Sequence, residues 1–217
     1  MMRKTAKKDG RTRGVITRQR LIEVAGDQFV EHGFHGTSMR RIASKAGVAV
    51  GGIYNHFGSK DALFAAVLDA DHPYHAVLPA LAQLQGATQA EFISHAMQQI
   101  WEQVRARQQR LLPLILIELV EFQGRHLQEM AERLLPTLIE FVNRFNERAE
   151  PLALPAPLIL RGMMSLVIGH MLTEMILARS PLMQQLDYDW FAANVDIYLH
   201  GILRRAAPAA AATPDPG

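Results

Sequence analysis

The chain has 217 residues, of which 49% are hydrophobic and 20% are charged, and it contains no cysteine. This composition supports a sizeable buried core and excludes global disorder. The lack of cysteine excludes a disulfide scaffold, a thiolate metal site and cysteine catalysis.

Charge is distributed unevenly along the chain. Residues 1–20 carry eight basic side chains and one acidic one, a net charge of +7, whereas the remaining residues carry 15 basic and 20 acidic side chains, a net charge of −5. This asymmetry predicts a basic flexible arm over residues 1–16 whose partner is a polyanion. The alternative is a disordered tail that only keeps the chain in solution. The N-terminus lacks the apolar region of a secretory signal, and no run of about 18 apolar residues indicates a membrane span. We therefore expect a cytoplasmic protein with no membrane partner.

Apolar residues recur at helical spacing throughout the chain, and no convincing strand alternation occurs, so the predicted fold class is all-α. The first helix is expected to begin near Thr17, a suitable N-cap, and to end at Gly33. A glycine at position 33 is a suitable helix end because glycine readily takes the left-handed conformation that ends a helix. Thr37 or Ser38 is expected to cap a second helix, which ends at Gly47.

Residues 37–57 follow the pattern of a helix–turn–helix module. A third, short helix is predicted over residues 50–57, and Ile53 and Phe57 give it an apolar inner face. Its outward face then consists of Val50, Gly51, Tyr54 and Asn55. In such modules the outward face of the second short helix enters the major groove of DNA. The alternative is an ordinary helical hairpin with an aromatic residue on its surface.

The side chains around this face suit a phosphate backbone. Gly51 and Gly52 allow a close approach to DNA, and Tyr54 and His56 are donors for phosphate oxygens. Lys60 is expected at the start of a fourth helix, where the unpaired backbone N–H groups also favour an anion.

Beyond residue 72 the chain becomes more apolar. Pro73 and Pro79 are expected to interrupt or kink the helices there. Thr88 and Glu91 have capping-box spacing, and further helical segments are predicted at 91–109, 111–122, 124–149, 158–178 and 187–205. The Ala/Pro-rich tail over residues 206–217 is expected to be disordered.

The run from Thr17 to Leu68, above all FVEHGFHGTSMRRIASKAGVAVGGIYNHFGSKDALFAAVL, closely resembles the DNA-binding segment of the tetracycline-repressor (TetR) family. The resemblance implies an all-α homodimer that represses transcription and leaves its DNA operator when a small-molecule effector binds. It assigns residues 17–58 to the helix–turn–helix DNA-binding domain and 59–71 to a linking helix. It assigns residues 72–205 to a ligand-binding and dimerisation domain.

The same resemblance implies roles for particular residues. Those that match DNA-contacting positions of the family are Thr37, Ser38, Arg40, Val50, Gly51, Gly52, Tyr54, His56 and Lys60. Two residues depart from the usual pattern. Ala49 replaces the polar cap of the recognition helix, and Arg41 replaces an acidic residue. Because positions 50–52 offer few donors, we expect readout through Arg40, Tyr54, Asn55, DNA shape and the N-terminal arm.

The apolar body holds the other predicted sites. An effector cavity among the middle helices is expected to draw on Met97, Trp101, Glu118, Phe122, Met130, Leu134, Met163 and His170, and an apolar or amphipathic ligand would suit its pliable methionines. The alternative is a packed helical core, with Glu118 facing water. A dimer interface is expected to use Leu166, Gly169, Thr173, Leu177, Phe191, Val195, Tyr198 and Leu199.

Other classes of function have weaker sequence support. The chain has no GxSxG, GxxxxGK[ST] or GxGxxG motif, so we expect no enzyme activity and no cofactor; an all-α enzyme is the distant alternative. Asp71 and His75 are four residues apart, but Pro73 lies between them and no third well-spaced ligand is present, so no metal site is expected. A regulator of this fold that a protein partner controls, without an inducer, remains an open alternative.

Overall fold

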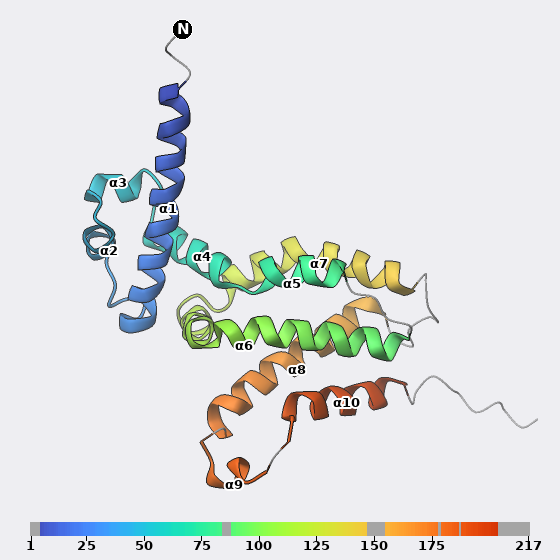
Figure 1. The fold of residues 1–217 in the computed structure, drawn as a ribbon. Coiled ribbons are helices and arrows are strands. Elements are labelled where there is room, and N and C mark those ends of the chain that lie inside the picture. Colours follow the sequence, from blue (N-terminus) through green and yellow to red (C-terminus); the bar gives the residue numbers. More distant parts are fainter. Residues whose placement is uncertain (1–4, 84–87, 147–154, 178, 187, 204–217) are drawn as a thin grey trace, which may run out of the picture. The chain divides into compact units, whose positions relative to one another are not determined.

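The computed structural model describes residues 5–83, 88–146, 155–177, 179–186 and 188–203. Every regular element within these ranges is a helix (Figure 1), which confirms the predicted all-α class. The chain divides into two compact units, the first comprising residues 1–75 and 106–133 and the second residues 76–105 and 134–217. The long helices α6 (Gln89–Glu121) and α7 (Arg125–Asn146) each contribute a part to both units. The sequence had assigned residues 106–133 to the C-terminal body.

The first helix is longer than the sequence indicated. Helix α1 spans Thr5–His32, so the predicted start near Thr17 is wrong. The stretch before Thr17 has no proline, and a glycine in a helix costs only about 1 kcal/mol, so Gly10 and Gly14 do not end it. Residues 5–16 of the basic segment therefore continue this helix. It ends as predicted, because Gly33 takes a φ of +70°.

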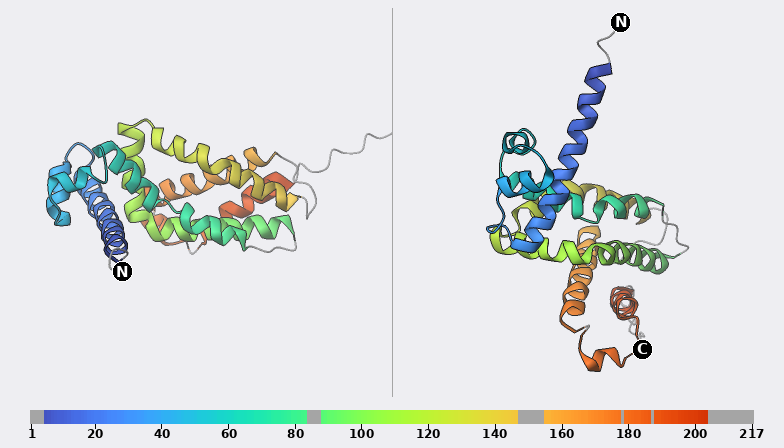
Figure 2. Two further views of the ribbon diagram at one scale, coloured as in Figure 1. Left: turned by 90° about the horizontal axis from the view of Figure 1, so that it is seen from above. Right: turned by 60° about the vertical axis from the view of Figure 1, so that its left-hand side comes forward.

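Local capping residues define the next three helices. Ser38 caps α2 (Met39–Ala46) by accepting a hydrogen bond from the Arg41 backbone N–H at 3.2 Å, and the Gly47 φ of 72° ends it. Helix α3 is Val50–Tyr54, shorter than the predicted 50–57, although its last turn continues as the Phe57 N–H donates to the Ile53 carbonyl at 2.9 Å. Ser59 caps α4 (Lys60–Asp71). Figures 1 and 2 show α2 against α1 and α3 against α2.

An aromatic cluster forms the centre of the first unit. Phe29 and Phe64 are fully buried, with ring centroids 5.2 Å apart. Phe122, from the end of α6, stacks on Phe64 at 5.0 Å and meets the Phe34 ring edge-on at 4.7 Å. This contact explains why residues 106–133 belong to the same unit as the N-terminal helices, since the cluster would be incomplete without Phe122.

The second unit contains most of the remaining helices. These are α5 (Tyr74–Ala82), which begins in the first unit and contains Pro79, and α8 (Ala156–Leu177), α9 (Pro181–Gln184) and α10 (Trp190–Leu203). The predicted capping box is present, with Thr88 and Glu91 each donating a backbone N–H to the other's side chain. Segments 91–109 and 111–122 form one helix, α6, which runs through Pro113. Helix α9 was not predicted, and the tail 206–217 lies outside the described residues.

Helix α8 packs against α10 within the second unit. The Tyr198 hydroxyl donates to the Ile159 carbonyl at 3.0 Å, and a Cβ at Gly162 would press on the Tyr198 ring. Gly162 therefore permits the close approach of the two helices. Among the described residues, α8 is the one helix long and apolar enough to cross a membrane, and 39% of its apolar window is buried. Core helices of other proteins pass the same test.

Candidate nucleic-acid interface

Helix α3 presents the outward face that its sequence predicted. Ile53 and Phe57 are buried, at 0% and 4% exposure, and they hold the helix against the rest of the module. Val50 and Tyr54 are 43% and 52% exposed, and Gly51 and Asn55 are also exposed. The exposed residues 50, 51, 54 and 55 lie at positions i, i+1, i+4 and i+5, which share one side of a helix.

The two glycines of α3 are not required by the fold. Apart from the chain neighbours and the helix's own backbone, no described atom would lie within 4 Å of a Cβ at Gly51, and a Cβ at Gly52 would meet only the Val48 Cβ, at 4.0 Å. Neither glycine has a left-handed φ. Each one costs a helix about 0.5–1 kcal/mol relative to alanine. The module therefore tolerates a less stable α3 with a bare backbone on its exposed side.

Helix α2 adds a basic surface next to this face. Its inner positions Met39, Ile42, Ala43 and Ala46 are buried, whereas Ser38, Arg40, Arg41 and Lys45 are exposed. Lys45 lies 4.0 Å from the Glu31 carboxylate, a distance at the limit of an ion pair. Arg40 and Arg41 are thus placed to contact an anion outside the protein, and the unusual Arg41 increases the positive charge there.

The structure places the side chains of Thr37 and Lys60 inside the module. Thr37 is 1% exposed, and its hydroxyl lies 2.9 Å from both the Gln28 and the Gly33 carbonyl oxygens. The Lys60 ammonium donates to the Phe34 and Thr37 carbonyls at 2.7 and 2.8 Å and lies over the Phe34 ring. Burial lowers the pKa of Lys60, and the charge of Glu121 partly opposes this shift. Both side chains hold the α1–α2 turn, and their predicted phosphate contacts stay predictions.

Two arginines of α1 brace the module, and the sequence analysis missed both. The Arg20 Nε donates to the Ala46 carbonyl at the end of α2, at 3.0 Å. The Arg18 guanidinium lies 5.0 Å from the centre of the Phe57 ring, just after α3. The positive charge of Arg18 and Arg20 is plain in the sequence, but their partners Phe57 and Ala46 are far away along the chain and could not be inferred from it.

Arg110 of α6 ties α1 to α4. Its Nε donates to the Asp71 carboxylate at 2.7 Å, its Nη1 to the Asp27 carboxylate at 2.7 Å, and its Nη2 to the Glu23 carbonyl at 3.0 Å. A Cβ at Gly26 would overlap the guanidinium. The missing side chain of Gly26 therefore makes room for the cation on the surface of α1.

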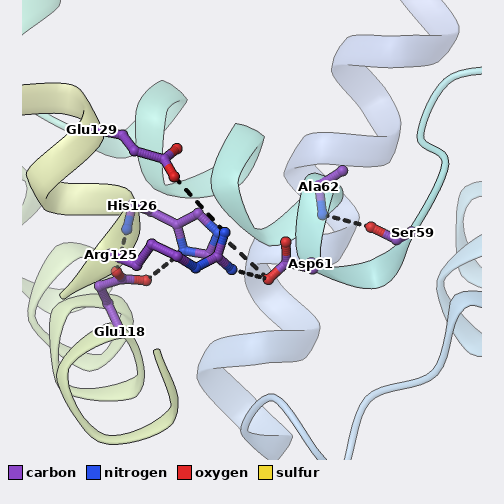
Figure 3. Close-up of polar contacts among 7 residues, drawn as sticks. All are labelled: Ser59, Asp61, Ala62, Glu118, Arg125, His126 and Glu129. Atoms are coloured by element: carbon purple, nitrogen blue, oxygen red, sulfur yellow. Dashed lines mark hydrogen bonds and ion pairs between the residues drawn. The ribbon is translucent and has the colours of Figure 1, made fainter. Parts of the chain in front are cut away.

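A buried contact between the Glu118 carboxylate and the His126 ring links α6 to α7 (Figure 3). Glu118 is fully buried and accepts the His126 backbone N–H at 2.7 Å, while its other oxygen lies 2.7 Å from His126 Nδ1. The other ring nitrogen of His126 is 3.5 Å from the Asp61 carboxylate on α4, and Arg125 donates to the same carboxylate at 2.7 Å. Glu118 was predicted either to line an effector cavity or to face water; the structure instead pairs it with His126.

This pair also stabilises an unusual turn. Gln123 and Gly124, between α6 and α7, have φ values of 56° and 82°, and the left-handed region is costly for a residue such as glutamine. The Gly124 N–H donates to the Glu118 carbonyl at 3.2 Å. Glu118 therefore holds the turn through its backbone carbonyl and through its side chain.

The predicted effector residues divide between the two units. Glu118, Phe122 and Met130 belong to the first unit, and Met97, Trp101, Leu134, Met163 and His170 to the second. In the second unit, Trp101 meets the His170 ring at 4.5 Å and stacks on Phe191 at 5.0 Å, which is a packed aromatic cluster. In the first unit a hollow of about 240 Å³ is lined by Ala65, Ala66, Asp69, His126, Glu129, Met130 and Arg133. Met130 is its one residue from the predicted set.

The predicted dimer residues divide between surface and core. Gly169, Thr173 and Leu177 of α8 are exposed and Leu166 is half-buried. Phe191, Val195 and Leu199 are buried within the second unit, and Tyr198 is half-buried against α8. The α10 residues of the predicted interface thus pack within the chain, and an apolar stripe in a sequence does not distinguish packing within a subunit from packing between subunits. Their role in a dimer stays a prediction. Exposed apolar side chains of this unit include Met164, Ile168, Met175 and Ile197.

Within the described ranges, no three histidine or acidic side chains converge in a way that would hold a metal ion. The His75 ring lies 3.5 Å from the Asp69 carboxylate. The same carboxylate accepts a hydrogen bond from the Tyr74 hydroxyl at 3.0 Å and one from Arg133 at 2.6 Å.

These features define a helix–turn–helix module with an exposed, basic surface. Residues 21–67 match the model of the bacterial regulatory proteins of the tetR family. These residues therefore belong to the TetR family, and the described chain has the fold of that family's regulators.

Individual proteins support this assignment. The chain is 40% identical over 57 residues to the transcriptional repressor AcnR of Corynebacterium efficiens, and 40% identical over 55 residues to the transcriptional regulator UidR of Escherichia coli. These matches span 26% and 25% of the chain but only 30% and 28% of the relatives. A TetR-family transcription regulator from Marinobacter aquaeolei superposes with a TM-score of 0.61 and 18% identity, over 88% of this chain and 98% of that one. The similar proteins are regulators rather than enzymes.

Proposed function

We propose that the protein is a transcriptional repressor that binds a palindromic DNA operator as a homodimer and leaves it when an apolar or amphipathic small molecule binds. The observation that carries the DNA-binding part is the exposed surface of α2 and α3 in a module that matches the tetR family. The two curated relatives are named as a repressor and a regulator of transcription. A dimer would place two copies of α3 on successive major grooves.

Within this surface we assign different tasks to different residues. Arg40 of α2 and Asn55 after α3 are exposed, and their side chains have the donors that read base edges. Tyr54 is exposed and His56 half-buried beside it, and both suit phosphate contacts. Ser38 uses its hydroxyl oxygen as the cap of α2, which leaves its O–H as a donor. The basic segment before Thr17, which continues α1, would add positive charge beside the phosphate backbone.

The test is binding of the full chain to a random pool of DNA duplexes, with sequencing of the selected fraction. We expect a palindrome or near-palindrome to be enriched. Arg40→Ala should relax the preference at one position of each half-site, a loss of about 1–3 kcal/mol of discrimination there. Tyr54→Phe, which removes only the hydroxyl, should weaken binding to every DNA sequence by the same factor and leave the sequence preference unchanged. A chain that enriches no sequence and binds DNA no better than a neutral protein would refute the proposal.

Lys60 provides a matched comparison with Arg40. Because its ammonium already donates to two backbone carbonyls, Lys60→Ala should lower the free energy of unfolding and leave the salt dependence of DNA binding nearly unchanged. A phosphate anchor would instead lower the slope of log K against log salt by about one. Chemical unfolding and a salt titration on the same variant decide between the two roles.

Release by a small molecule is proposed because TetR-family regulators typically leave their operator when an effector binds. In the alternative, a protein partner controls the regulator, and no small molecule binds to it. Denaturing extraction of the purified protein, followed by mass spectrometry, would find a small organic molecule if an effector copurifies. A set of apolar and amphipathic compounds that all fail to release the operator would favour the alternative.

A further inference from the structure

The reading face of α3 combines an exposed apolar side chain with a bare backbone. Val50 is 43% exposed although it is apolar, and the next two residues are glycines. In a helix–turn–helix module the N-terminal residues of the second helix contact the base edges. Residues 50–52 therefore present the methyl groups of Val50 and the backbone of two glycines to the base edges, with no side-chain donor or acceptor.

The fold does not require the two glycines of this face. The space around Gly51 would accept an alanine, and Gly52 would meet only the Val48 Cβ at 4.0 Å. Alanine would also make a better helix. A bare backbone on an exposed helix face is useful only where another molecule must come close to it.

The chemistry of the major groove names the matching group. Each base pair presents hydrogen-bonding groups there, but only thymine adds an apolar group, its C5-methyl. Apolar side chains select thymine by packing on this methyl group. We propose that Val50, Gly51 and Gly52 recognise thymine methyl groups, so that T·A pairs in each operator half-site are read by apolar contact. This inference rests on the proposed DNA-binding function.

Uracil provides the test because it differs from thymine in major-groove chemistry by the methyl group alone. The duplex selected by the full chain from the random pool is resynthesised with deoxyuridine in place of thymidine, one half-site position at a time. At one T·A pair of each half-site we expect the affinity to fall about fourfold per methyl group lost, equivalent to about 0.8 kcal/mol.

Two variants test whether the protein side of the contact is correct. Val50→Ala removes two methyl groups from an exposed position, and it should reduce the difference between the thymine and uracil duplexes. Gly51→Ala adds a methyl group that the protein itself can accommodate, and it should weaken binding to the thymine duplex more than to the uracil duplex. Arg40→Ala is the matched control on α2, and it should keep the full thymine preference.

The outcomes separate the two proposals. Equal affinity for thymine and uracil at every position overturns the inference and leaves the regulator proposal intact. A uracil effect that Val50→Ala and Gly51→Ala leave unchanged also overturns it, because the effect then arises within the DNA. A pool from which nothing is enriched refutes the DNA-binding function and this inference with it.

Discussion

His72 is the residue whose environment predicts a pH dependence of stability. It follows α4 and is largely buried, and burial lowers its pKa to about 4, with the Asp69 charge opposing the shift and His75 adding to it. Its Nδ1 accepts the Tyr74 backbone N–H at 3.3 Å, which requires an unprotonated nitrogen. The neutral imidazole is therefore part of the native structure at the α4–α5 junction.

The sign of the effect follows from proton binding. Between pH 6.5 and about 4 the unfolded chain binds a proton at His72 and the folded chain does not, so stability falls as the pH falls through this range. For this group alone we expect a loss of about 2 kcal/mol between pH 7 and pH 5. Urea unfolding of the wild type and of His72→Asn at both pH values measures it. A variant with the same pH dependence as the wild type would show that His72 is not responsible.

The same scale shows what a sequence can and cannot indicate. The end of α1 at Gly33, the cap Ser38 and the Thr88–Glu91 box are local, and all three were correctly predicted. The carbonyl contacts of the Lys60 ammonium could not be predicted, because those carbonyls lie 26 and 23 residues away along the chain. A sequence shows which residue types are present, but only the fold determines which distant groups they meet.

At the scale of elements, Arg110 and Gly26 are expected to act as one unit. Gly26→Ala should raise stability by about 0.5–1 kcal/mol from helix propensity alone. In this chain the added methyl group would push the Arg110 guanidinium from its place on α1 and disturb its contacts with Asp27 and Asp71. We therefore expect Gly26→Ala to destabilise the wild type by about 1 kcal/mol.

A double-mutant cycle tests this coupling. In an Arg110→Ala background the obstruction is gone, so Gly26→Ala should become stabilising by about 0.5–1 kcal/mol. The measurement is the free energy of unfolding of the four proteins, and the change of sign is the diagnostic result. If Gly26→Ala has the same effect in both backgrounds, the two residues do not act together.

The boundaries of elements and units were harder to predict than the helices themselves. The helix α1 extends back to Thr5 because nothing before Thr17 stops it, whereas the N-cap preference of threonine is weak enough to be overridden. The membership of residues 106–133 in the first unit depends on Phe122, Glu118 and Arg110. Their roles are long-range contacts, and no periodicity in the sequence reports them.

At the scale of the whole molecule, the proposed homodimer needs an apolar surface that is exposed in a single chain. Met164, Ile168 and Met175 share one face of α8 and are 50%, 47% and 47% exposed, and Ile197 of α10 is 71% exposed. These four replace Phe191, Val195 and Leu199 as candidates, since those three are already buried within the chain. We expect the exposed set to be covered by a second copy.

The test is oligomeric state by native mass spectrometry and analytical ultracentrifugation. Ile168→Glu combined with Ile197→Glu should convert a dimer to a monomer, because the interface would bury two unpaired charges per subunit. The far-UV circular dichroism should stay unchanged, since both positions are exposed. Leu182→Glu in α9, at an equally exposed leucine of 62%, is the control and should remain a dimer. If the double variant still dimerises, another surface joins the subunits. If it becomes a monomer, its affinity for a palindrome should fall at least about 100-fold, because each half-site would then bind alone.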